Sequence, residues 1–292
     1  MNFHNDEWIM ARLQEHYDEA LTLFPEDRIV GIFLQGSQNY GLDIEGSDID
    51  TKLIVVPTWD DICFNRKPVS TTHIRANEEH IDLKDIRLYI QTFRKQNLNF
   101  VEILFTPYKI LNPRYDKHWN RLVANREAIA HYNPAGAIKT MKGIAMEKIH
   151  AMEHRYPSKI DIIDKYGYDC KQLHHLLRVE EFMARYTAGE RYEDCMAPKG
   201  CDYLKSVKQN LYNLEEARVH AVAARANIEW MYDKFMEDHE MKADAVIDAI
   251  LDSVQCDIME NAIYRELSMK YMDKCVEDLK KKGLWGSYEP ED

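Results

Sequence analysis

The first part of the chain alternates between apolar repeats of helical spacing and short apolar runs of strand length. Apolar residues recur near every fourth position over 7–23, which predicts a helix, and Pro25 ends it. Two apolar runs with β-branched residues, at 28–35 and 49–56, predict strands, and a third strand is expected at 80–83 with a helix after it. This part of the chain is therefore predicted to combine a sheet with helices.

The pattern changes after Asn133-Pro134, where strand-like runs stop and helical spacing continues toward the end of the chain. The helices predicted there cover 135–154, 169–188, 203–236 and 241–282. We therefore place a domain boundary near 134. The expected organisation is an α+β domain over 1–134 followed by an all-α domain over 135–292.

Composition narrows the class of protein. The chain has 292 residues, 45% of them hydrophobic and 30% charged, which is enough for one large domain or two modest ones. Its formal net charge of −12 argues against extensive nonspecific DNA binding, which relies on Lys and Arg. No apolar run is long enough for a membrane span, and the first residues lack an apolar signal core. Six scattered cysteines do not make a disulfide framework, so a reducing cytosol is expected.

The most informative segment is 31–56. One predicted strand ends at Gly36-Ser37, and the next begins at Ser47-Asp48-Ile49-Asp50, eleven residues after the glycine. Because side chains alternate along a strand, Asp48 and Asp50 point the same way, roughly 6.5 Å apart at their Cα atoms. Two carboxylates this close suit a hard divalent cation such as Mg²⁺ or Mn²⁺ that also binds phosphate oxygens. The glycine lets a phosphate approach the backbone, and a helix start after it would direct N–H groups at the anion.

Two-metal phosphoryl transfer needs a third carboxylate. Asp82 is the best candidate because it lies on a predicted neighbouring strand. Glu78, Glu79 and Asp85 are close in the sequence and compete for the same role. The alternative interpretation of Asp82 is an exposed acid near a helix start, where the helix dipole stabilises carboxylates.

A locally basic stretch lies in the predicted helical domain. Residues 139–178 contain eight Lys or Arg against five Asp or Glu, a local charge of +3 in an acidic chain. Within it, Lys171, His175 and Arg178 have the spacing of one helix face. Such a face beside a metal–carboxylate site would bind the β and γ phosphates of a nucleoside triphosphate. The alternative is a solvated helix face, which is the usual origin of such patterns.

Taken together, these motifs resemble the DNA polymerase β-like nucleotidyltransferase superfamily, whose pattern is a Gly-Ser turn, a strand-borne Asp-x-Asp and a later third Asp. More specifically, the chain is similar to the RNA ligase-associated (RNA repair pathway) predicted nucleotidyltransferase family of bacteria and phages. The resemblance covers roughly residues 28–235, and one departure is Asn210, where a glycine is expected. Its further motifs are Tyr40-Gly41, Asn99-Phe100-Val101-Glu102 with Pro107, Tyr166-Gly167-Tyr168-Asp169-x-Lys171-x3-His175-x2-Arg178, Leu204-Lys205-x-Val207-Lys208 and Asn213-Leu214-Glu215-Glu216.

The resemblance implies an α+β enzyme with a polymerase β-like catalytic domain, a mixed sheet flanked by helices, and an all-α domain that closes the active-site cleft. The enzyme would transfer a nucleoside monophosphate from a triphosphate such as ATP to an acceptor hydroxyl, with release of pyrophosphate. The implied catalytic and metal-binding residues are Asp48, Asp50 and Asp82. The implied nucleotide-binding residues are Gly36, Ser37, Lys171, His175 and Arg178.

The acceptor stays open among an RNA end, a protein hydroxyl, a small molecule and a second nucleotide. Two other classes also stay open. One is a catalytically silent nucleotide-binding module, against which the intact Asp-x-Asp with a third Asp argues. The other is an antitoxin-like partner-binding protein, whose helices from 203 onward would form an oligomer interface. The expected location is the cytoplasm of a bacterial cell or phage-infected host, without a membrane partner.

Overall fold

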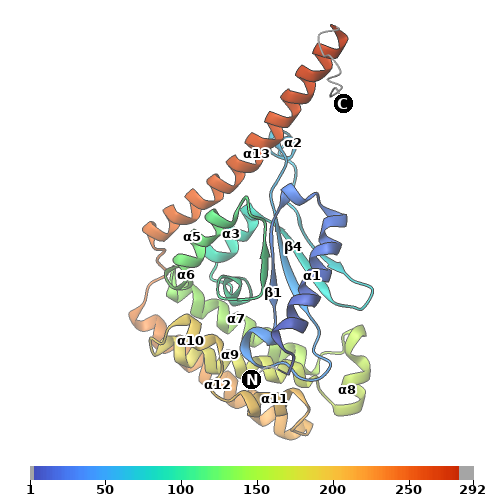
Figure 1. The fold of residues 1–292 in the computed structure, drawn as a ribbon. Helices are drawn as coiled ribbons and strands as arrows, with labels where there is room; N and C mark the ends of the chain where they lie inside the picture. The colour runs from blue at the N-terminus through green and yellow to red at the C-terminus, as the bar shows by residue number, and fades with distance from the viewer. Residues whose placement is uncertain (1–2, 283–292) are drawn as a thin grey trace.

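The computed structural model describes residues 3–282, and a five-stranded sheet forms the core of its N-terminal part (Figure 1). The strands lie in the order β3-β4-β2-β1-β5. They are β1 (Ile29–Gln35), β2 (Asp50–Val55), β3 (Ser70–Ile74), β4 (His80–Asp85) and β5 (Lys109–Leu111). The sheet is mixed, because β2 and β4 are parallel whereas the other neighbours are antiparallel. Gln35 pairs with Asp50, so the last residue of β1 and the first residue of β2 lie side by side at one end of these strands.

Helices cover both faces of this sheet. The N-terminal helices are α1 (Asp6–Leu23), α2 (Trp59–Cys63), α3 (Ile86–Arg94), α4 (Leu98–Val101), α5 (Asp116–Ala124) and α6 (Arg126–Ala130). On one face, Leu13 of α1 belongs to the same buried cluster as Ile32 and Leu53. On the other face, the ring of Phe33 packs against the ring of Trp119 in α5, with 4.5 Å between the ring centres. A strand buried on both faces is apolar at nearly every position, which accounts for the sequence of β1.

The remainder of the described chain is helical. Its helices are α7 (Pro134–Glu153), α8 (Ile160–Tyr166), α9 (Cys170–Thr187), α10 (Tyr192–Met196), α11 (Cys201–Lys208), α12 (Leu214–Asp238) and α13 (Ala245–Lys281). One hydrophobic cluster joins both parts, since it contains Phe33 of β1, Phe182 of α9 and Ile258 of α13. The domain boundary at 134 stays a prediction. None of the helices within residues 3–282 is long and apolar enough to cross a membrane.

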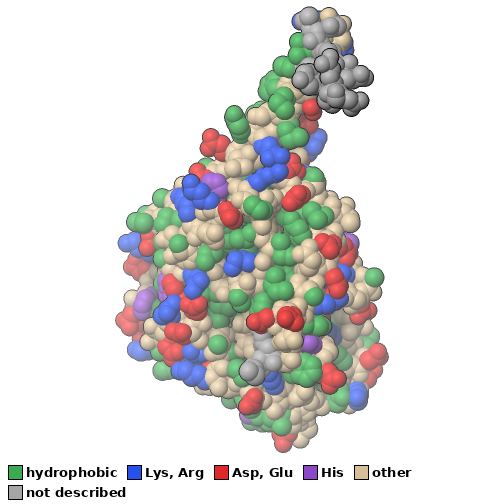
Figure 2. All heavy atoms as spheres, in the orientation of Figure 1, with side chains coloured by type: hydrophobic (Ala, Val, Ile, Leu, Met, Phe, Trp, Pro, Cys, Tyr) green, Lys and Arg blue, Asp and Glu red, His purple; other side chains and the backbone are tan. Residues whose placement is uncertain are grey.

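The C-terminal half of α13 projects beyond the body of the molecule (Figure 1). Apolar side chains are exposed along this projection (Figure 2), and they include Tyr264, Met269, Tyr271 and Met272. Exposed apolar side chains that gather on one element are a common feature of interaction surfaces. An oligomer through the C-terminal helices stays a prediction.

The expected fold class is confirmed: a mixed sheet flanked by helices is followed by an all-α region. The helical region over 203–236, for which a break was also considered, consists of two helices, because a turn at 209–213 separates α11 from α12. The sequence pattern missed β3. Four of its five residues are exposed, so it lacks the apolar alternation that marks a half-buried strand.

Candidate functional site

The turn after β1 forms the first part of the site. Gly36 has φ +114° and ψ −163°, a backbone conformation that residues with a Cβ rarely adopt. Ser37 then begins the four-residue 3₁₀ helix η2 (Ser37–Tyr40), in the place where the sequence predicted a helix start. The side-chain amide of Gln38 donates a 2.8 Å hydrogen bond to the carbonyl of Asp48. The Gly-Ser turn and the Asp-x-Asp segment are therefore held against each other.

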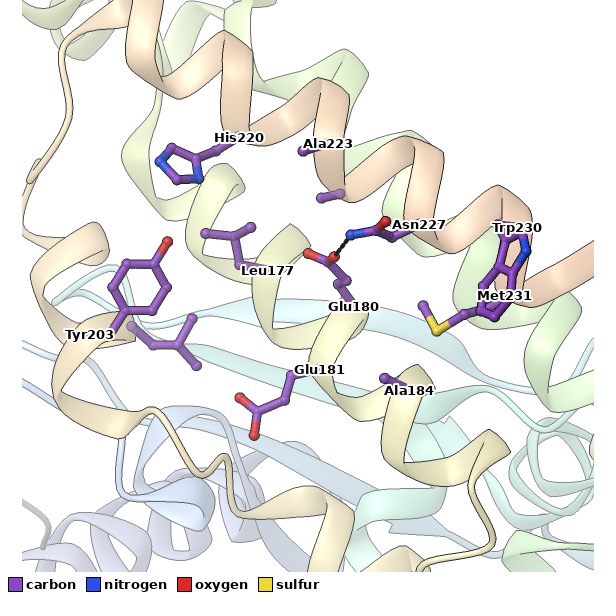
Figure 3. Close-up of a pocket in the computed structure, with 12 residues that line it drawn as sticks. Leu177, Glu180, Glu181, Ala184, Tyr203, His220, Ala223, Asn227, Trp230 and Met231 are labelled. Atoms are coloured by element: carbon purple, nitrogen blue, oxygen red, sulfur yellow. Dashed lines mark hydrogen bonds between the residues drawn. The ribbon is translucent and has the colours of Figure 1, made fainter.

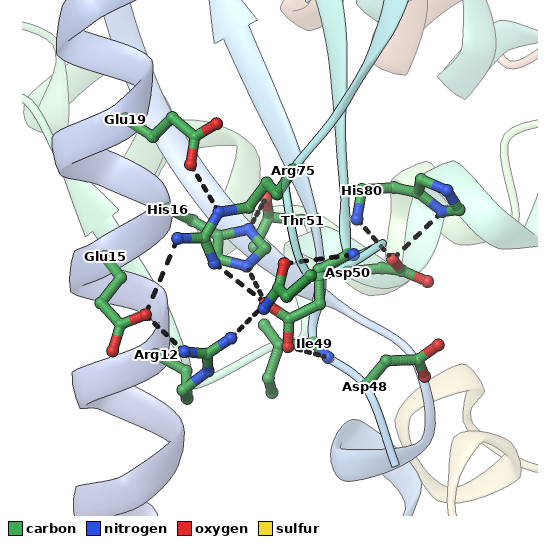
Figure 4. A network of polar contacts seen from close by, with 12 residues as sticks. Arg12, Glu15, His16, Glu19, Asp48, Ile49, Asp50, Thr51, Arg75 and His80 are labelled. Carbon is green, nitrogen blue, oxygen red and sulfur yellow. Dashed lines mark hydrogen bonds and ion pairs between the residues drawn. The ribbon is translucent and has the colours of Figure 1, made fainter. Parts of the chain in front are cut away.

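Asp48 and Asp50 lie at the start of β2, separated by the buried Ile49. Asp48 is exposed, and the Asp50 side chain is 35% exposed. The backbone N–H of His80 donates to Asp50 Oδ1 at 3.0 Å, and the His80 ring Nδ1 lies 3.4 Å from the same oxygen (Figure 4). Burial and the neighbouring charge of Asp48 raise the pKa of Asp50. A pair of carboxylates that repel each other fits a divalent cation, which would remove that repulsion.

The buried carboxylate of Glu79 holds the backbone between these two aspartates. Glu79 Oε1 accepts a 3.1 Å hydrogen bond from the N–H of Ile49. Its Oε2 is 2.9 Å from both His16 Nε2 and Arg75 Nη1, and it also accepts from Arg12. Burial alone would raise the pKa of Glu79, but its hydrogen bonds and the charge of Arg12 lower it to about 2. Glu79 is thus a structural anion that orients Ile49 and, through it, the two aspartates.

Glu78 and Asp85, the other two candidates for the third carboxylate, lie at the two ends of β4. Glu78 is exposed and lies in the turn between β3 and β4, with φ +68°. Asp85 is buried, accepts the N-cap hydrogen bond of α3 from Arg87 N–H, and pairs with the Arg87 guanidinium at 2.7 Å. Both positions favour a local structural role.

Asp82 lies on β4, but it is paired with a lysine. The parallel register places Asp82 beside Lys52 of β2, and Lys52 Nζ is 3.0 Å from Asp82 Oδ2. The Lys52 side chain is only 2% exposed, and burial lowers its pKa against the opposing effect of Asp82. Within residues 3–282, no three His, Cys, Asp or Glu side chains form a group that could hold a metal ion. Asp82 is paired with Lys52 and lies beside it, not beside Asp50, and its role as a metal ligand stays a prediction.

Lys208 reaches from the end of α11 into the Gly-Ser turn. Its ammonium donates to Ser37 Oγ at 3.4 Å, to the Leu42 carbonyl at 3.4 Å and to Ser47 Oγ at 3.2 Å. None of the carboxylates in the described part of the chain lies within ion-pair distance of it. Burial, followed by the nearby charge of Lys171, lowers its pKa. Sequence reasoning did not select Lys208 as a site residue, although the Lys205-x-Val207-Lys208 motif contained the signal.

Arg178, which the sequence placed on a phosphate-binding face, contacts Tyr40 at the end of η2. Its side chain is 9% exposed, and its guanidinium lies 3.6 Å from the centre of the Tyr40 ring. Tyr40 O–H donates to Glu102 Oε2, and Arg178 Nη2 lies 3.8 Å from that oxygen. Burial raises the pKa of Glu102 to about 8, although Arg178 opposes the shift. Arg178 therefore supports Tyr40 at the end of η2.

The other two members of the predicted helix face lie nearer to the start of α9. Lys171 is exposed in the first turn, and His175 is partly buried. Burial lowers the pKa of His175, and the charges of His174, Arg178, Lys148 and Lys208 lower it further. The structure thus groups positive charge around His175 and beside the Gly-Ser turn.

A separate cavity of about 570 Å³ lies between α9, α11 and α12 (Figure 3). Its walls include Leu177, Tyr203 and Trp230, and two carboxylates, Glu180 and Glu181, also line it. None of the predicted site residues lines this cavity. Since it contains acids and no Lys or Arg, its charge does not suit a phosphate.

No protein-family model and no curated protein matches this chain. Among solved structures, it is similar to a nucleotidyltransferase-like protein from Exiguobacterium sibiricum 255-15, with 12% identity and a TM-score of 0.28. The match covers 94% of this chain and 92% of that chain. Likeness at this level does not carry an argument about function, which has to rest on the site itself.

Proposed function

We propose that this protein is a metal-dependent nucleotidyltransferase, whose triphosphate substrate binds between the Gly-Ser turn and the start of β2. Gly36 and Ser37 would contact the phosphates, and Asp48 and Asp50 would hold a Mg²⁺ or Mn²⁺ ion. Such a cation would neutralise charge on the phosphates and on the carboxylate pair.

The observation that carries the proposal is the position of Lys208 between the Gly-Ser turn and Ser47, the residue before Asp48. Its ammonium contacts three neutral oxygens, from Ser37, Leu42 and Ser47. A half-buried cation without a paired carboxylate is suited to an anion that arrives with a ligand. The positive charge near His175 extends the same side of the site, and we assign Lys171 and His175 to the outer phosphates.

The proposed reaction joins an acceptor hydroxyl to the α-phosphorus. The acceptor oxygen forms a new P–O bond, the bond from the α-phosphorus to the bridging oxygen breaks, and pyrophosphate leaves with that electron pair. The acceptor proton passes to a carboxylate of the site or to water. The acceptor is an RNA end, a protein hydroxyl, a small molecule or a second nucleotide.

Pyrophosphate release tests this proposal. The protein is incubated with each α-labelled nucleoside triphosphate, Mg²⁺, and either total RNA or lysate. We expect pyrophosphate and a labelled product with the wild type, and neither with Asp50→Asn. Nucleotide binding without any pyrophosphate or labelled product would instead identify a silent nucleotide-binding module.

A further inference from the structure

We infer that Lys52 supplies the second positive charge of the site, so that one divalent cation, not two, accompanies the nucleotide. This inference rests on the proposed function and adds to it the number of metal ions. Two-metal sites use a further carboxylate beside the first pair. In this protein, the carboxylate available for that purpose already holds a lysine.

The register of β2 and β4 is the first argument. Thr51 pairs with Ile81 and Lys52 with Asp82, so the residue beside Asp50 is His80. Asp82 therefore lies two residues farther along β4 than the position beside Asp50, a distance of roughly 6.5 Å between Cα atoms. The strand pairing fixes this offset and places Asp82 directly beside Lys52.

The burial of Lys52 is the second argument. Asp50 and Lys52 alternate along β2 and so point to the same side. Lys52 Nζ lies 3.0 Å from Asp82 Oδ2 and 4.0 Å from the centre of the Phe100 ring, which closes over it. Burying a lysine is costly unless it is paired, and a buried pair rarely stabilises a fold more than apolar residues would. A role in the site explains why a lysine is buried at this position.

Lys52 also lies close to the proposed metal site. Lys52 is two residues from Asp50, and the charge of Asp50 acts on the Lys52 ammonium. A cation held permanently by Asp82 stabilises negative charge on phosphate without a second metal ion. Asp82 then acts as a positioning residue for Lys52, and its predicted role as a metal ligand is replaced.

Counting bound metal tests the inference directly. The free Mn²⁺ signal in electron paramagnetic resonance is followed while Mn²⁺ is added to the wild type with one equivalent of α,β-methylene-ATP. We expect one Mn²⁺ per protein–nucleotide complex. Two Mn²⁺ per complex would overturn the inference and leave the proposed function intact. A wild type that binds no nucleotide would refute the proposed function and this inference with it.

Two variants provide the matched comparison. Lys52→Met removes the charge at similar volume, so Asp82 is released and a second Mn²⁺ should bind. The double variant Lys52→Met/Asp82→Asn should again bind one Mn²⁺ per protein–nucleotide complex. If Lys52→Met binds a single Mn²⁺ while it remains folded by circular dichroism, Lys52 does not occupy the place of a cation. If the variant does not fold, the count in the wild type decides.

Discussion

Replacing Glu79 by glutamine should reveal how strongly the buried network supports the Asp-x-Asp segment. Glutamine keeps an oxygen for the Ile49 amide but removes the negative charge that faces Arg12 and Arg75. The pKa of Glu79 is lowered from 4.5 to about 2. A shift of this size corresponds to about 3 kcal/mol, which is similar to the loss expected when a buried ion pair is broken. We therefore expect Glu79→Gln to lower the free energy of unfolding by about 3 kcal/mol at pH 7.

The sign of the pH dependence follows from the lowered pKa. The stabilisation from Glu79 is complete above its unfolded-state pKa of 4.5 and is lost as the pH falls from 4.5 toward 2. Urea unfolding of the wild type and of Glu79→Gln should therefore differ most at neutral pH and converge in acid. Glu19→Gln is the control, because Glu19 pairs with Arg75 and His73 of the same network but is 30% exposed. We expect a loss of at most about 1 kcal/mol for this control. Equal losses for the two variants, or a pH-independent difference for Glu79→Gln, would refute the reasoning.

Three further predictions concern the turn and its supports. Lys208→Ala should weaken triphosphate binding roughly ten- to hundred-fold in calorimetry, since it removes a charge-assisted contact worth about 1.5–3 kcal/mol; an unchanged affinity would exclude this lysine from the phosphate site. Burial raises the pKa of Glu102 to about 8, whereas its pKa in the unfolded state is 4.5. The free energy of unfolding of the wild type should therefore rise as the pH falls from 8 toward 4.5, and urea unfolding should show that Glu102→Gln lacks this rise. Ser37→Ala should weaken nucleotide binding with little change in Tm. Gly36→Val should weaken binding and also lower Tm, because the φ of +114° at position 36 is strained for valine. A large loss of Tm with intact nucleotide binding in Ser37→Ala would make the turn purely structural.

Much of the fold could be predicted from the sequence because its elements carry strong local signals. The β1 and β2 runs are apolar and β-branched, and α7 begins at Pro134, where the strand-like pattern stops. The Gly-Ser turn also has a local signal, because Gly36 adopts φ +114°, and Asp50 lies where the second apolar run begins as β2.

The rest of the site depends on contacts between distant segments, which no local pattern encodes. Helical spacing placed Lys171, His175 and Arg178 on one face, but it could not show that Arg178 stacks on Tyr40, far away in the chain. The partner of Asp82 depends on the β2–β4 register, and a shift of two residues would have placed it beside Asp50. A sequence motif contains Lys208, but the motif does not show what Lys208 contacts, because only the packing of α11 brings it to Ser37.

Calorimetric titration with ATP, in the presence and absence of Mg²⁺, tests the central claim most directly. The claim is that the Gly-Ser turn and the Asp48–Asp50 pair together bind a metal-associated triphosphate. The wild type should bind ATP more tightly when Mg²⁺ is present, and Asp48→Asn/Asp50→Asn should lose this binding while keeping its Tm. The same affinity in the double variant as in the wild type, with or without Mg²⁺, would contradict the claim.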